Sequence, residues 1–168
     1  MKTAAMFLAP LFVLCGLLPQ MVPAATRPDI DPCTLIALKV VSAAFPTLQT
    51  MKKQTIGPNT TCNYLNRSGL SGLIVSVHRD DGISAHTMME NLGKGYRAVD
   101  VPGLGDEAAM AVTLPEPKYD IPGGLVAELY IKKGDSALLL APARIEVKAG
   151  GSSLDRLKKL AARMLDRL

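Results

Sequence analysis

Residues 101–112 constrain the fold more than any other stretch, because they join a rigid turn to an alternating apolar segment. Pro102 fixes its own backbone angle φ, whereas Gly103 and Gly105 allow a positive φ or the close approach of another backbone segment. From Ala108 onward, successive residues point to opposite sides, as in a strand with one face on a core. The stretch therefore predicts a turn that leads directly into a core strand.

Residues 1–24 have the composition of a secretory signal peptide. Lys2 precedes an apolar run that Pro10 interrupts, and this run is short for a membrane span of roughly 20 residues. Small residues come before the expected cleavage site, so we expect cleavage after Ala24 or after Ala25. An uncleaved N-terminal anchor is the less favoured alternative.

The leader also contains Cys15, but Leu14 before it is too large for a lipid-attachment site, so lipidation is not expected. Removal of the leader leaves residues 25–168, a length typical of a single domain with its own core. We therefore expect one domain of an exported protein, either periplasmic or secreted.

The charge and the aromatic content argue against a nucleic-acid partner. The whole chain has a net charge of +4, with no tryptophan, four tyrosines and three phenylalanines. Proteins that bind nucleic acids concentrate basic patches and supply aromatic rings on which bases stack. This chain is only weakly basic and has few such rings.

Outside the leader the chain has two cysteines, Cys33 and Cys62. An even number of cysteines in an exported protein favours a disulfide. The alternative is a redox or metal pair, which is not favoured because the chain lacks a Cys-x-x-Cys motif and has no histidine close to either cysteine in sequence. We expect a disulfide between Cys33 and Cys62, and no cofactor.

Hydrophobic spacing and turn residues predict three helices and five strands. Thr34 is expected to cap the first helix, and Ser152 with Asp155 resembles a capping box for the last. The fold class is therefore α+β, with a mainly antiparallel sheet of about five strands, helices packed on one face and one disulfide. The helices are expected at 34–45, 83–92 and 153–168, the strands at 62–65, 73–78, 108–114, 125–132 and 136–141, and loops at 47–60 and 115–124.

Several short motifs carry a resemblance through their order along the chain. They are Pro32-Cys33, Cys62-Asn63-Tyr64, the Pro-Gly-Leu-Gly-Asp-Glu-Ala run within 101–108, the Lys-Lys-Gly-Asp turn at 132–135, and a leucine-rich last helix. In this order the chain resembles a widespread group of small exported bacterial proteins and lipoproteins of unknown function. The resemblance implies a location in the cell envelope and an antiparallel sheet covered by helices, but no reaction.

Two histidines and two carboxylates raise the question of a metal site. Imidazole and carboxylate groups are normal metal ligands, and His78 and His86 flank Asp80 and Asp81. However, the histidines lie on different predicted elements, and the sequence implies no third strong ligand. A metal site is therefore not favoured.

Asp106 and Glu107 are the nearest approach to an acid–base pair. Adjacent residues on a strand point to opposite faces, so the two carboxylates are not expected to share a site. The chain also lacks a Gly-x-Ser-x-Gly motif and a phosphate-binding loop. Turn capping and solvation are the favoured roles of these two acids.

Basic side chains form a stripe along the last predicted helix and are candidates for partner binding: Arg156, Lys159, Arg163 and Arg167. They could contact anionic lipid headgroups or an acidic partner, although an ordinary solvated face is the favoured interpretation.

The favoured function is a non-enzymatic binding or accessory module of the bacterial envelope. Its sheet face or its loop 115–124 would contact an unknown protein or small ligand. The first alternative is an inhibitor of an exported hydrolase. The second is a small enzyme whose site is assembled from dispersed residues, of which the nearest candidates are His78, His86, Asp106 and Glu107.

Overall fold

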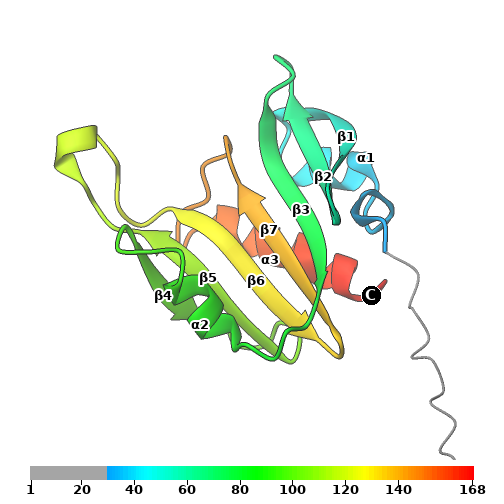
Figure 1. Cartoon of the computed structure of the whole chain (residues 1–168). Coiled ribbons are helices and arrows are strands. Elements are labelled where there is room, and N and C mark those ends of the chain that lie inside the picture. Colours follow the sequence, from blue (N-terminus) through cyan, green and yellow to red (C-terminus); the bar gives the residue numbers. More distant parts are fainter. Residues whose placement is uncertain (1–29) are drawn as a thin grey trace, which may run out of the picture.

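The computed structural model describes residues 30–168, so the predicted signal peptide lies outside the described residues. These residues form one seven-stranded sheet in the order β1-β2-β3-β7-β6-β5-β4, and each neighbouring pair is antiparallel (Figure 1). The predicted α+β class is confirmed. The strands are β1 (Leu48–Ile56), β2 (Asn59–Asn66), β3 (Ser71–Arg79), β4 (Tyr96–Asp100), β5 (Glu107–Thr113), β6 (Val126–Lys133) and β7 (Ser136–Pro142); the helices are α1 (Leu38–Ala44), α2 (Ala85–Glu90) and α3 (Ser152–Leu165), with short 3₁₀ turns η1 (Pro32–Thr34) and η2 (Pro117–Tyr119).

The prediction of about five strands was wrong, because it missed the two strands at the edges of the sheet. β1 has a single buried residue, Leu48, and the segment was predicted to be a loop because its sequence has no alternating apolar side. β4 has no fully buried residue. Edge strands need only one paired neighbour and little core contact, so their sequences carry a weak strand pattern.

Helices α1 and α3 cover one face of the sheet, which we call the closed face. Alternate strand residues such as Val75, Leu129 and Leu138 are fully buried there and join one large apolar cluster with Leu157 and Met164 of α3. The 3.6-residue spacing of the leucines in α3 provides the matching apolar stripe. This cluster is the main core of the domain.

Helix α2 packs on the opposite face, which we call the α2 face, so the prediction that all helices lie on one face was wrong (Figure 1). Ala85 and Met89 of α2 contact Ala109 and Ala111 of β5, which alternate with the residues of the main core. These alanines are small enough for a helix to lie close to the strand. The helix is short and contacts mainly β4, β5 and β6.

The N-terminal caps of two helices also differ from the prediction. Thr34 belongs to η1 and does not cap α1, which starts after Ala37 without a side-chain cap. The N-cap of α3 is Gly151, so the expected capping box does not form. Instead, the Ser153 hydroxyl accepts a hydrogen bond from the backbone N–H of Lys148, 3.0 Å away.

The turn and strand at 101–112 form as predicted. Gly103 and Gly105 have φ angles of +76° and +66°. Gly105 also packs closely, because a Cβ atom there would lie 2.4 Å from the carbonyl oxygen of Lys132. Val101 and Leu104 join the main core on the closed face. The motif therefore fixes how β5 lies against β6.

The predicted disulfide between Cys33 and Cys62 is confirmed, and it links η1 to β2. Cys62 is buried among the residues of the closed face. The neighbouring Tyr64 hydroxyl donates a hydrogen bond to the carbonyl oxygen of Ile36, and burial raises the pKa of Tyr64 to about 12. Both contacts attach the N-terminal segment to the sheet.

Candidate functional site

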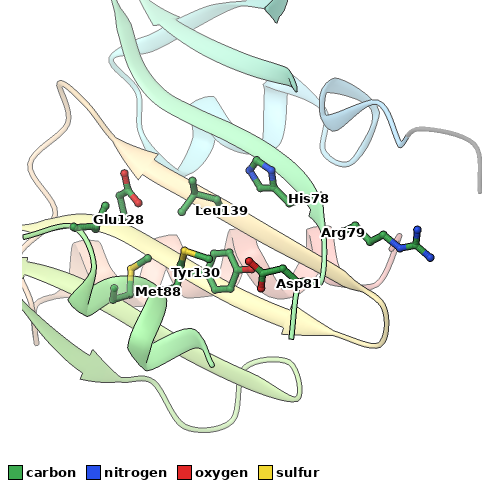
Figure 2. A pocket seen from close by; sticks show the side chains of 9 residues that line it. His78, Arg79, Asp81, Met88, Glu128, Tyr130 and Leu139 are labelled. Atoms are coloured by element: carbon green, nitrogen blue, oxygen red, sulfur yellow. The ribbon is translucent and has the colours of Figure 1, made fainter. Parts of the chain in front are cut away.

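A cleft of about 450 Å³ lies beside α2 on the α2 face of the sheet (Figure 2). Its volume falls in the range of roughly 300–1,000 Å³ that is usual for small-molecule sites. The cleft is lined by residues of β3, β6 and β7, by a residue that follows β3, and by α2 and a residue that follows its end. These residues are His78, Arg79, Asp81, Met88, Met89, Leu92, Glu128, Tyr130 and Leu139.

The strand register places the floor of this cleft. Ser76 of β3 is opposite Leu139 of β7, and Leu139 is opposite Tyr130 of β6. These side chains therefore form a row across three strands on the α2 face. Met88 and Leu92 form an apolar wall beside this floor.

Two caps hold the N-terminus of α2, and with it the wall of the cleft. The Ser84 hydroxyl accepts a hydrogen bond from the backbone N–H of Thr87 at 3.1 Å. The carboxylate of Glu107 accepts one from the backbone N–H of Ala85 at 2.8 Å, which attaches the helix to β5. Both contacts satisfy N–H groups that the first turn of a helix leaves without partners.

Glu128 is the polar residue at one end of the cleft (Figure 2). It lies on β6 between Ala127 and the fully buried Leu129, and its position in the sheet is opposite Ala111. Within residues 30–168 its carboxylate has no hydrogen bond and no ion pair, and partial burial raises the pKa of Glu128 above its usual value. Its oxygens are therefore available to a ligand.

His78 and Asp81 lie toward the other end, with Leu139 and Tyr130 between them and Glu128 (Figure 2). The ring nitrogen Nε2 of His78 lies 2.8 Å from the Ser76 hydroxyl oxygen. Burial lowers the pKa of His78, and the nearby Asp81 partly opposes this shift, so the neutral ring is favoured. Ser76 is 5 % exposed, and its hydroxyl serves as the partner of His78.

The structure separates the two histidines that the sequence singled out. His86 lies outside the cleft, with Nδ1 2.7 Å from Asp100 and Nε2 3.4 Å from Glu90. Asp80 forms an ion pair with Lys132 at 2.9 Å. Between residues 30 and 168 no three His, Cys, Asp or Glu side chains come together in a way that could hold a metal ion.

Asp106 and Glu107 each bind a different backbone segment. Asp106 accepts a hydrogen bond from the backbone N–H of Gly134 at 2.7 Å, in the turn between β6 and β7. Glu107 holds the start of α2, as described above. The structure therefore gives these two acids capping roles, as the sequence suggested.

The four basic residues proposed for partner binding are all exposed and lie away from the cleft. Arg156, Lys159 and Arg163 lie on α3, on the closed face of the sheet, whereas Arg167 follows the C-cap of this helix, so the predicted helix to residue 168 ends three residues early. The Arg156 guanidinium lies 5.5 Å from the centre of the Phe45 ring, and Arg167 donates a hydrogen bond to the carbonyl oxygen of Thr34. Lys159 and Arg163 complete this stripe. The loop 115–124 projects from the sheet and exposes Tyr119 and Ile121, and it too does not line the cleft (Figure 1).

Comparisons with protein-family models, curated proteins and solved structures give no match for this chain. Its site is therefore interpreted from its own geometry. In the part of the chain that the structure describes, no helix combines the length and the apolar character that crossing a membrane would require.

Proposed function

We propose that this protein is an exported, non-enzymatic binding module of the bacterial cell envelope, and that the cleft beside α2 holds a small, largely apolar ligand. The observation that carries the proposal is the cleft itself, with an apolar floor and wall and a few polar groups toward its ends. Such a lining is typical of sites that bind small molecules.

Export is supported by two features of the chain. The disulfide between Cys33 and Cys62 fits an oxidising compartment, because cytosolic thiols are kept reduced. The composition of residues 1–24 adds the pattern of a secretory leader. An inhibitor of an exported hydrolase and a small enzyme are the alternatives, and neither draws support from a particular contact within residues 30–168.

The test is a titration of the protein with N-phenyl-1-naphthylamine, a neutral dye whose emission rises in an apolar site. We expect saturable binding to the wild type at one site per chain. The variant Leu139→Trp, which fills the floor of the cleft, should weaken binding by about tenfold or more, because a filled pocket excludes the apolar ring.

The matched control is Ile121→Trp, which places the same side chain on the exposed loop 115–124. It should bind the dye as the wild type does. Absence of dye binding to the wild type, or equal binding to Leu139→Trp, would show that the cleft is not a ligand site. Circular dichroism of each variant checks that the sheet is intact.

A further inference from the structure

We infer that the cleft selects ligands that carry a protonated amine, and that this cation pairs with Glu128. The inference rests on the proposed function, because it specifies the polar group of the ligand that the cleft would hold. It is carried by the position of one carboxylate at the end of an apolar cleft.

Glu128 differs from the other carboxylates that lie close to the sheet. Those groups have partners within residues 30–168: Asp31 pairs with Lys53, Asp80 with Lys132, Asp106 with the N–H of Gly134, and Glu107 with the N–H of Ala85. Glu128 has none, although it is partly withdrawn from water. A carboxylate loses hydration in such a position, and a cation that binds it offsets that loss.

The other charged groups of the lining favour a cation over an anion. Asp81 is a second acid at the opposite end of the cleft, and His78 favours its neutral form. Arg79 is the one basic side chain of the lining that is always charged, and Figure 2 shows it pointing away from the cleft. A carboxylate or phosphate ligand would meet two acids here, whereas the guanidinium of Arg79 points away from the place that an amine would occupy.

The apolar part of the cleft suits the rest of such a ligand. The Tyr130 ring lies between the two acidic ends and offers an aromatic surface, which attracts cations as well as apolar groups. Met88 contributes a flexible side chain that adapts to ligands of irregular shape. The ligand class is therefore a small primary or secondary amine with an apolar body.

The experiment compares three competitors that share one apolar body: 4-phenylbutylamine, 4-phenylbutanol and 4-phenylbutyrate. Each displaces N-phenyl-1-naphthylamine from the wild type and from the isosteric variant Glu128→Gln at pH 7. In the wild type the amine should bind about tenfold or more tightly than the alcohol, as expected of a hydrogen bond between charged groups. The carboxylate should bind most weakly.

In Glu128→Gln the ratio of the amine affinity to the alcohol affinity should fall to about twofold or less, whatever the affinity of the variant for the dye itself. Circular dichroism and urea unfolding check that the variant is folded. The matched control is Glu116→Gln, on the exposed loop 115–124, which should keep the full preference for the amine.

The outcomes separate the two proposals. If the dye does not bind the wild type at the cleft, the proposed function fails. If the dye binds but the wild type does not prefer the amine, or if Glu128→Gln keeps that preference, the inference about Glu128 is wrong while the cleft remains a ligand site. Loss of the preference in Asp81→Asn alone would assign the cation to the other end and would equally overturn the inference.

Discussion

The two faces of the sheet are formed by alternate residues of the same strands, yet the side chains on the two faces differ in size, polarity and burial. On the closed face, Leu129 and Leu140 are fully buried beneath α3, a helix of 14 residues. On the α2 face, the same strands present Leu139 and Glu128 beside α2, a helix of six residues. The large aliphatic residues of the closed face supply stability, whereas the α2 face combines small and polar residues with partial cover. Stability and ligand binding should therefore be separable by mutation.

The largest effect should come from the disulfide on the closed-face side. The double variant Cys33→Ala/Cys62→Ala should lose about 3–4 kcal/mol of unfolding free energy, because the bridge closes a loop across a sequence separation of 29 residues. Urea unfolding without reductant measures the loss, and reduction of the wild type provides the control. A loss below about 1 kcal/mol would contradict the role given to the bridge.

Leu140 and Leu139 test the two faces directly, because they are neighbours in sequence and point to opposite sides of β7. Leu140→Ala should cost about 3 kcal/mol, within the range for a fully buried leucine in a packed core. Leu139→Ala should cost about 1 kcal/mol or less, because Leu139 is only partly buried on the α2 face. Equal losses in urea unfolding would mean that the α2 face is packed as tightly as the closed face.

The two glycines of the 101–112 stretch offer a matched pair on the closed-face side. Both have positive φ, so an alanine at either position is strained by about 1 kcal/mol. Gly105→Ala should cost about 2–3 kcal/mol, because its Cβ would also clash with the carbonyl oxygen of Lys132 and with Ile131. Gly103 faces open space, so Gly103→Ala should show the smaller loss. Thermal unfolding of the two variants compares them, and a reversed order would contradict this account.

Much of the fold could be predicted from local patterns, and what was missed depends on tertiary contacts. The core strand after Ala108, the turn at Gly134 and the Cys33–Cys62 pair each have a sequence signal that does not depend on distant residues. β1 and β4 have no such signal, because an edge strand is held by hydrogen bonds to one neighbour while its side chains stay mostly exposed. The position of α2 on the opposite face depends on Ala109 and Ala111, whose small size does not by itself indicate a packed surface.

The candidate site could be predicted only in part. In the sequence, His78 was considered as a metal ligand, which was not favoured, and as one residue of a dispersed enzyme site, but not as part of a cleft. Glu128 was missed because a glutamate that alternates with apolar residues in a strand normally faces water. Its partial burial comes from the cleft that α2 and the neighbouring strands build around it. The register places Ala111 of β5 opposite Glu128, where a lysine or arginine could have paired with it. This pairing is likewise visible only in the structure.

The smallest effect should be a pH-dependent one at Glu128. Burial raises the pKa of this carboxyl in the folded protein above its ordinary value of 4.5, so the folded state holds its proton more tightly than the unfolded state does. The protonated carboxyl therefore stabilises the folded state in full at pH values below the ordinary pKa of 4.5. This contribution is lost as the pH rises through the raised pKa of the folded protein. Glu128→Gln removes this ionisation, and it should therefore be more stable than the wild type at pH 7, by less than about 1 kcal/mol.

The gain should disappear near pH 4, where Glu128 is protonated and the wild type and the variant both carry a neutral group. His78 and Asp81 line the same cleft, but they are present in both proteins, so their contributions cancel when the two are compared at each pH. Urea unfolding at several pH values measures the difference, and Glu116→Gln on the exposed loop serves as the control. A gain that is the same at pH 4 and pH 7 would show that the substitution acts through packing. A loss at pH 7 would show that the Glu128 carboxylate has a stabilising partner, and would also remove the reason to assign it to a ligand amine.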